Sequence, residues 1–280
     1  MCSSDLAASS TRRAGTRCSS SRSGARSSID ARAGSRRTRS RSPRASRTCS
    51  GPAWRRSPRD LRRLLLALGL SEDARTSTLA RLLGARAIDE AERAGLVLLD
   101  GERVRPAHPL LLAVARRRSG PSERRELHRR LADLTDDGEL RVLNLALAAE
   151  EPDPELSTAL AEAGRRAFGR GVVERAVVLA EHALRLAPGG SRDRPELVLA
   201  LAEYLLAAGD QGRAARLLLP EVDGLPDGAA RVRGHLLLAD SAAVSTVQEH
   251  AERLELALAA ADDPALRAPV LVRMVEHWAV

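Results

Sequence analysis

The sequence predicts a mainly α-helical protein in which a small winged-helix module is followed by tetratricopeptide-like (TPR-like) helical hairpin repeats. Three observations lead to this fold class. Leu and Ala recur at helical spacing from residue 61 onward, a segment with β-hairpin character interrupts them near residue 100, and one Ala/Leu pattern recurs later at intervals of 38 and 37 residues. We expect a disordered segment over residues 1–58, the winged-helix module over 59–118 and the repeats over 119–280.

Residues 1–60 differ in composition from the rest of the chain. They contain 15 Arg, 16 Ser and three acidic residues, whereas Leu6 and Ile29 are their only Leu, Ile, Val or Phe. This small amount of apolar surface cannot offset the conformational entropy that the segment would lose on ordering. We therefore expect the segment to be disordered. We interpret the segment as out-of-frame translation of GC-rich DNA, because residues 2–6 (CSSDL) resemble a translated sequencing-library adapter. The alternative is a genuine Arg/Ser arm that binds phosphate backbones.

Charge and residue usage exclude several classes of function. Residues 1–60 carry a balance of +12 and residues 61–280 one of −4, so the second part has no basic field that attracts nucleic acid. The sequence contains no Lys, which excludes a P-loop or Schiff-base lysine. Its three cysteines, Cys2, Cys18 and Cys49, have neither metal-ligand nor redox spacing. The longest run without Asp, Glu or Arg, residues 106–115, is far shorter than the roughly 20 residues of a membrane helix. We therefore expect a cytoplasmic protein without membrane contact.

The elements expected between residues 59 and 118 are three short helices and a hairpin. The first helix ends near Leu70, and Ser71 is a candidate N-cap for the second, which ends at Gly84. The third ends at Gly95, which can adopt a left-handed cap. Residues 96–105 then predict a β-hairpin with Asp100-Gly101 in the turn. This order is typical of a winged helix, but the third helix mixes acidic and basic residues, so we expect a structural role rather than DNA binding.

The repeat region predicts pairs of helices. We expect a first pair from 154 to the glycines 169 and 171 and from directly after them to 187, with an apolar stripe over 176–187. Further pairs are expected over about 195–208 and 212–219 and over 228–243 and 247–261, with one more helix opening at Asp263-Pro264. Thr246 and Glu249 fit a capping box. Alignment of the second helices brings Ala176, Ala214 and Ala251 into register, each followed three residues later by Leu. Small residues at such positions let successive hairpins stack and share a core.

Residues 105–111, Arg-Pro-Ala-His-Pro-Leu-Leu, resemble the Arg-Phe-x-His-Pro-Leu-Leu signature that follows the ATPase module in large LuxR-type regulators. These proteins belong to the signal-transducing ATPases with numerous domains. The resemblance continues through residues 124–132, 144–149 and 208–210 in the family's order, and it covers most of residues 61–270. Pro106 and Asn144 depart from the family pattern, which usually has an aromatic residue at the first position and often His at the second.

The resemblance implies the sensor and relay region of an ATP-dependent transcription regulator. We expect its ATPase core and its C-terminal helix-turn-helix to be absent from this chain, so that DNA is contacted only through the absent domain. ATP or ADP is implied for the intact protein, and a protein or small-molecule signal is implied for the repeats. His108 resembles a histidine that touches the β-phosphate of ADP in related proteins, and its alternative role is capping or packing.

No catalytic residue, metal ligand or bound cofactor is expected in this chain itself, and hence no enzymatic activity. No two of its six histidines have the spacing of a zinc-protease helix. A different class of function remains open, namely a stand-alone TPR-like protein-interaction adaptor with a basic Arg/Ser arm that binds nucleic acid.

Overall fold

The computed structural model describes residues 59–72, 74–241 and 246–278, all of which belong to one compact unit, Cys49–Val280. This part of the chain holds thirteen α-helices, one short 3-10 helix and one two-stranded antiparallel sheet, so the mainly α-helical prediction is confirmed. The disorder expected for residues 1–58 lies outside the described residues. Among the described helices, none is long and apolar enough to cross a bilayer.

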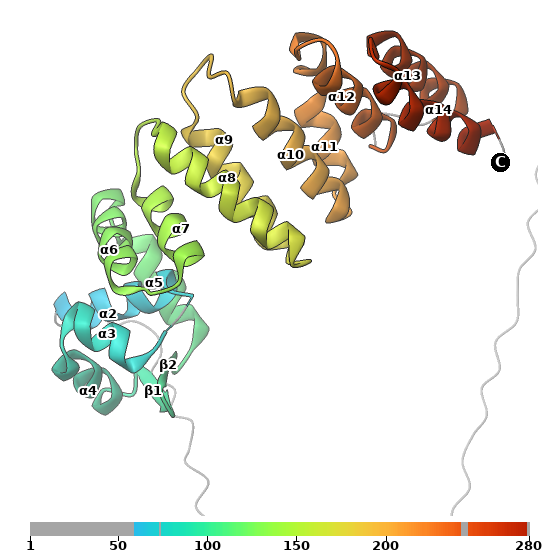
Figure 1. Ribbon diagram of the computed structural model, residues 1–280. Helices are drawn as coiled ribbons and strands as arrows, with labels where there is room; N and C mark the ends of the chain where they lie inside the picture. Colours follow the sequence, from blue (N-terminus) through green and yellow to red (C-terminus); the bar gives the residue numbers. More distant parts are fainter. Residues whose placement is uncertain (1–58, 73, 242–245, 279–280) are drawn as a thin grey trace, which may run out of the picture. The chain divides into compact units, whose positions relative to one another are not determined.

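The first elements surround a central helix, α2 (Figure 1). In chain order they are α2 (Arg59–Leu70), α3 (Thr76–Leu83), α4 (Ala85–Arg93), β1 (Val97–Asp100), β2 (Arg103–Pro106) and α5 (Pro109–Arg118). Three successive leucines of α2, Leu64, Leu65 and Leu66, are at most 1% exposed. Consecutive residues point to different sides of a helix, so α2 needs apolar neighbours on several sides. Helices α3, α4 and α5 and strand β2 supply them.

The predicted N-cap at Ser71 is wrong. Helix α3 begins later, at Thr76, and its N-cap residue Arg75 makes no side-chain capping bond. Instead, Thr76 donates from both its backbone N and its Oγ1 to the carbonyl oxygen of Glu102, at 2.7 and 3.1 Å. A helix start needs acceptors for its free N–H groups, and here the hairpin supplies one of them.

The β-hairpin is present, but its turn lies one residue later than predicted. Asp100 pairs with Arg103 in the antiparallel register, so Gly101 and Glu102 form the connection. Gly101 adopts a φ of 58°, which glycine tolerates because it has no Cβ. The left-handed cap expected at Gly95 is confirmed, with a φ of 66°.

The core built around α2 continues past residue 118. Helix α6 (Pro121–Leu134) buries Leu127 and Leu131 in the same cluster that holds Leu64 of α2 and Val104 of β2. Helix α7 (Gly138–Ala148) packs against α6. Its N-cap is Asp137, whose carboxylate accepts from the backbone N–H groups of Glu139 and Leu140. The predicted boundary between residues 118 and 119 therefore falls within a continuous core.

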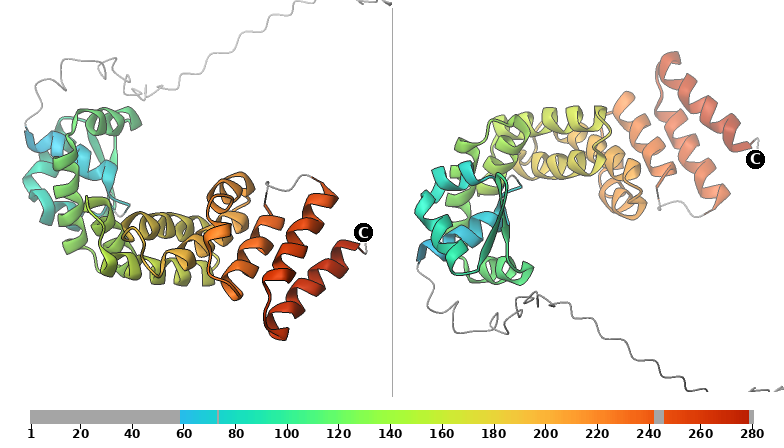
Figure 2. Two further views of the ribbon diagram at one scale, coloured as in Figure 1. Left: turned by 90° about the horizontal axis from the view of Figure 1, so that it is seen from above. Right: turned by 90° about the horizontal axis from the view of Figure 1, so that it is seen from below.

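Three helical hairpins follow in chain order, and each packs against the next (Figures 1 and 2). They are α8 (Pro154–Gly169) with α9 (Val173–Leu186), α10 (Arg194–Ala207) with α11 (Gln211–Leu218), and α12 (Ala229–Ala239) with α13 (Val247–Ala260); the 3-10 helix η1 (Val222–Gly224) precedes α12, and α14 (Pro264–Trp278) closes the described region. The predicted capping box at Thr246 and Glu249 is present. Helix α12 ends at Ala239, earlier than predicted, and residues 242–245 lie outside the described part.

The Ala and Leu positions of the register are not equally buried in the three hairpins: Leu179 and Leu254 are fully buried, whereas Leu217 is partly buried. Ala176 of α9 and Ala214 of α11 are fully buried, whereas Ala251 of α13 is partly buried. The second helices begin at Val173, Gln211 and Val247, which are 38 and then 36 residues apart. Helix α13 therefore begins one residue earlier than the 37-residue interval of the sequence pattern implies.

Substitution of Ala214 by Arg should unfold the second hairpin and loosen both neighbours. Ala214 is fully buried in the cluster shared by α8, α9 and α10, so a guanidinium there is both overpacked and desolvated, at a typical cost of several kcal/mol. Thermal unfolding followed by circular dichroism should show a large drop in Tm. A Tm equal to that of the parent would contradict the close-packed seam.

The matched control is Arg216→Ala, on the exposed side of the same helix. We expect it to change stability by about 0.5 kcal/mol or less. Arg213 is less suitable, because it forms an ion pair with Glu181 of α9.

Candidate functional site

A hollow of about 430 Å³ lies between α8 and α10, with α9 at its base. We call it the α8/α10 groove. One wall is formed by Pro154, Ser157, Thr158, Ala161 and Arg165, the other by Asp193, Glu196, Leu197, Ala200 and Tyr204, and Ala180, Pro188 and Ser191 complete the lining. Its volume falls within the range of about 300 to 1,000 Å³ that is usual for small-molecule sites.

The two walls consist of repeat-equivalent positions. Every residue of the first wall has a counterpart 39 residues later in the second, from the pair Pro154 and Asp193 to the pair Arg165 and Tyr204. The spacing along each wall is i, i+3, i+4, i+7 and i+11, which places the residues on one face of a helix. Ala161 and Ala200 form one of these pairs, and their short side chains leave the space that the groove occupies.

Helices α8 and α10 run in the same direction. The start of α8 lies against the end of α9, since Asp153 N donates to Leu186 O at 2.9 Å and Ser157 Oγ donates to Ala183 O at 2.8 Å. Helix α10 starts from that same end of α9, after the short loop that contains Pro188 and Ser191. Towards the other ends of the two helices, Phe168 and Tyr204 stack with ring centroids 4.5 Å apart.

The stacked pair joins the only Phe and the only Tyr of the chain. Tyr204 is 4% exposed, and burial raises the pKa of its phenol. The neighbouring carboxylate of Glu203 raises this pKa further, while the guanidinium of Arg165 opposes the shift. Tyr204 therefore remains a neutral hydroxyl that can donate a hydrogen bond, with a positive charge close to it.

Opposite charges line the two ends of the groove. Arg165 lies near Tyr204, whereas Asp193 lies about three helical turns away and Glu196 about two, at the start of α10. Glu196 is paired with Arg233 of α12 at 2.8 Å, so its charge is partly neutralised. Asp193 makes no capping bond to its helix. Within the described residues, neither Asp193 nor Arg165 has an ion-pair partner.

Sequence reasoning missed Arg165 and Tyr204. The Ala/Leu pattern that predicts the repeat lies in the second helices of the hairpins, whereas Arg165 and Tyr204 lie in first helices. The first helices also correspond to each other, at an interval of 39 residues that matches Ala161 with Ala200 and Arg165 with Tyr204. The sequence therefore contains the 39-residue correspondence, but the charged residues form a site only because α8 and α10 lie side by side.

His108, the residue predicted to sense a phosphate, is the N-cap of α5. Its Nδ1 accepts from Leu110 N at 3.2 Å, and Pro109 occupies the first helical position. An imidazole nitrogen that accepts carries no proton, so a neutral His108 has its proton on Nε2. The side chain is exposed, which leaves Nε2 able to donate to an anion. The capping role is thus observed, and the phosphate contact stays a prediction.

A second cluster, His128, His182, Arg124 and Arg185, lines an open cleft between α6, α7 and α9. Both arginines of this cluster already donate to backbone carbonyl groups. Arg185 donates to Ala146 O at 2.6 Å, and Arg124 donates to Ser119 O at 3.3 Å. Both carbonyls belong to helix C-termini, where a cation offsets the helix dipole. This cleft is therefore primarily a structural joint.

Burial lowers the pKa of His128, which is 6% exposed, although its bond to Asn144 opposes the shift. The Nδ1 of His128 lies 2.8 Å from Asn144 Oδ1, while Asn144 Nδ2 donates to Leu140 O. The amide oxygen is thus the acceptor, so Nδ1 is the protonated nitrogen of a neutral imidazole. Burial likewise lowers the pKa of His182, with a further contribution from Arg185.

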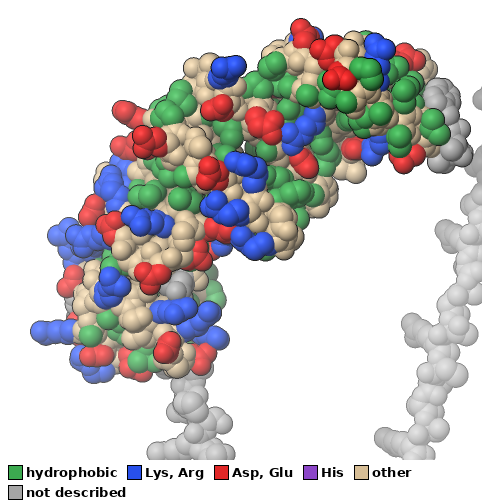
Figure 3. All heavy atoms as spheres, in the orientation of Figure 1, with side chains coloured by type: hydrophobic (Ala, Val, Ile, Leu, Met, Phe, Trp, Pro, Cys, Tyr) green, Lys and Arg blue, Asp and Glu red, His purple; other side chains and the backbone are tan. Residues whose placement is uncertain are grey.

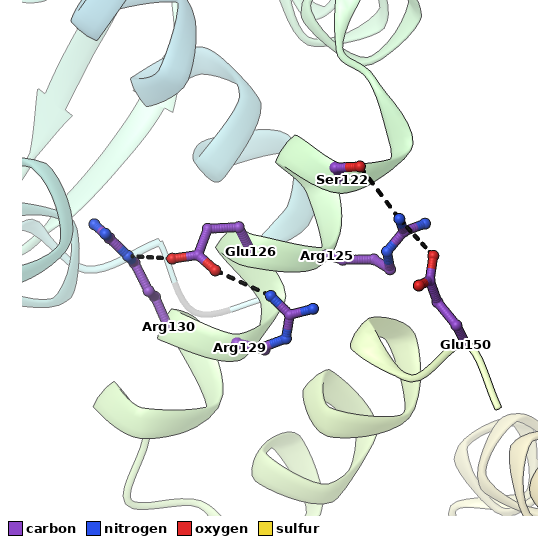
Figure 4. Close-up of polar contacts among 6 residues, drawn as sticks. All are labelled: Ser122, Arg125, Glu126, Arg129, Arg130 and Glu150. Atoms are coloured by element: carbon purple, nitrogen blue, oxygen red, sulfur yellow. Dashed lines mark hydrogen bonds and ion pairs between the residues drawn. The ribbon is translucent and has the colours of Figure 1, made fainter. Parts of the chain in front are cut away.

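The outer face of α6 carries a ladder of exposed ion pairs (Figure 4). Glu126 accepts from Arg129 and Arg130, each at 3.0 Å, and the bond from Arg130 is the main cause of its lowered pKa. Arg125 pairs with Glu150 and donates to Ser122 at 3.2 Å. Pairs of this kind on a solvated helix contribute little to stability.

Acidic and basic side chains are interspersed over the face of the described region in Figure 3, without a large field of one sign. Residues 59–72, 74–241 and 246–278 contain no group of three or more His, Cys, Asp or Glu that could hold a metal ion. Comparison with known proteins adds no relative, since no family model, curated protein or solved structure matches the chain.

Replacement of His108 by Ala should destabilise α5, because the first backbone N–H groups of the helix lose an acceptor. We expect a loss of about 1 kcal/mol, the usual effect of removing an N-cap. His108→Asn, which restores a capping oxygen, should retain most of the stability. Denaturant unfolding of both variants checks this, and equal stability of His108→Ala and the parent would contradict the capping role.

Stability should fall as the pH drops below about 6.5, the ordinary pKa of His. The folded protein holds His128 at a lowered pKa, so the unfolded state binds more protons at mildly acidic pH and is favoured there. The stabilisation is complete above pH 6.5 and is lost as the pH falls towards the lowered value. Thermal unfolding at pH 7.5 and pH 5.5 measures the effect.

The variant Asn144→Asp offers a test specific to His128. A carboxylate at this position favours the charged imidazole and should raise the pKa of His128. We expect the variant to lose less stability than the parent between pH 7.5 and pH 5.5. A larger loss in the variant would refute the assigned role of His128.

Proposed function

We propose that this chain is the sensor and relay segment of a large LuxR-type ATP-dependent transcription regulator. In this proposal, α2 to α5 with the hairpin form the winged-helix module, and the hairpins from α8 onward form a TPR-like array. The α8/α10 groove receives the signal. Nucleotide binding and promoter binding belong to modules that lie elsewhere in the intact protein.

One observation carries the proposal: residues 105–111 span the end of β2 and the start of α5, with His108 as the N-cap between them. The proposed phosphate contact needs a donor at a helix start, where free backbone N–H groups also favour an anion. The exposed Nε2 of His108 fits that requirement. ADP held by an adjoining ATPase module would supply the anion.

The charges of α4 support a relay role rather than DNA binding by the hairpin module. In a winged helix, the third helix is the element that enters the major groove. Here Arg86 is paired with Glu90 at 2.9 Å, and Asp89 and Glu92 add further negative charge to this helix. Such a surface repels phosphates about as strongly as it attracts them.

The reading frame upstream of codon 61 tests the proposal. In the genomic locus, the frame continuous with residue 61 should encode a Walker-type phosphate loop, and the frame downstream of residue 280 a helix-turn-helix. If that frame encodes no phosphate loop and the Arg/Ser segment is translated as given, the adaptor alternative is favoured instead.

The isolated chain should not bind ATP, because its sequence contains no P-loop. Isothermal titration calorimetry with Mg-ATP and with ADP should give no heat of binding at micromolar protein. Micromolar ATP affinity would overturn the assignment of His108 as a contact that needs a separate nucleotide-binding module.

A further inference from the structure

The α8/α10 groove carries charged side chains at both ends and mainly small or apolar side chains between them. Arg165 and Tyr204 lie at one end, and Asp193 lies at the other, beside Glu196. The middle is lined by Ala161, Ala200 and Leu197, and by Thr158, whose hydroxyl donates to Pro154 O at 3.0 Å. In the repeat alignment Arg165 is equivalent to Tyr204, which lies 11 residues after Asp193. This separation corresponds to about 16 Å along a helix axis.

Not every charged side chain of the groove is paired with another charge of the protein. Glu196 has Arg233 as a partner, and Arg233 also pairs with Glu203. Burial alone would lower the pKa of Arg233, but its bonds to these two carboxylates outweigh burial and raise it. Arg165 and Asp193, by contrast, have no such partner within the described residues, so both can pair with charges of a ligand.

We propose that the groove binds an extended zwitterion, with a carboxylate at Arg165 and Tyr204 and a cationic group at Asp193. Arg favours carboxylates because its planar guanidinium can donate two parallel hydrogen bonds, and Tyr204 can add a third. The short side chains of Ala161 and Ala200 admit a slim apolar chain between the charges. This inference gives the chemical class of the signal in the proposed function and rests on that proposal only for its biological meaning.

Two kinds of molecule have this chemistry at the required length. A peptide spans up to about 3.3 to 3.6 Å per residue, so roughly five small residues cover 16 Å. A linear ω-amino acid of similar length carries the same two charges without peptide groups. Penta-alanine and 12-aminododecanoic acid are therefore the two probes.

Isothermal titration calorimetry of the full chain at low salt tests the proposal. At least one free-ended probe should bind with an affinity in the micromolar to millimolar range. Blocking either end of that probe, as an amide at the carboxylate or an acetyl group at the amine, should weaken binding about tenfold. Binding of penta-alanine alone would identify a peptide ligand, and binding of the amino acid alone a non-peptide one.

Two variants assign each charge to its end of the groove. In Arg165→Gln, amidation of the probe should no longer weaken binding, while acetylation still should. In Asp193→Asn the pattern should be reversed. Such a cycle isolates one pairwise interaction, because each variant removes one partner only.

The control variants are Arg166→Gln and Glu162→Gln, which alter a neighbouring pair of α8 that does not line the groove. Both should bind the probes like the parent. Ala161→Leu should fill the groove and abolish binding, with circular dichroism showing an intact fold. The proposal is overturned if neither probe binds at millimolar concentration, if blocked and free ends bind equally, or if a folded Ala161→Leu variant binds normally.

Discussion

Close packing of alanines between neighbouring helices is the constraint on which the repeat region depends. Ala163 and Ala167 of α8 and Ala176 and Ala183 of α9 are all fully buried. A hairpin of such helices has too little apolar surface of its own to form a core, so each must share one with the next. The same close approach aligns α8 with α10 across α9. The α8/α10 groove exists because the shared core fixes that alignment while the facing residues Ala161 and Ala200 remain small.

The helices could largely be predicted from the sequence, because their periodicity and their capping residues are local. Prediction failed where the chain folds back on itself. Ser71 has the right chemistry for an N-cap, but Glu102, 26 residues beyond Thr76, supplies the acceptor instead. No local pattern reports a bond of that range. The candidate site has the same character, since Arg165 and Tyr204 are ordinary surface and core residues until α8 and α10 lie side by side.

The chain contains Arg but no Lys, and several of its arginines donate to backbone carbonyl groups at helix ends. Arg185 reaches from α9 to Ala146 O of α7, and Arg124 to the carbonyl of Ser119. Arg231 donates in the same way to Leu225 O at 2.7 Å, and Arg267 to Ala261 O at 3.0 Å. A guanidinium has five N–H donors in a fixed plane, so one Arg side chain can donate to several carbonyl groups at once. The ammonium group of Lys is a compact point charge instead. These arginines thus satisfy carbonyl groups that are left free where helices end.

The two walls of the α8/α10 groove belong to different hairpins, and α9 lies beneath them as a common support. The width of the groove is therefore tied to the angle between one hairpin and the next. A rotation of a few degrees about α9 moves the far ends of helices as long as α8 and α10 by more than an ångström, whereas the floor at Ala180 hardly moves. A ligand that fills the groove therefore sets the distance between α8 and α10, and with it the angle between the two hairpins.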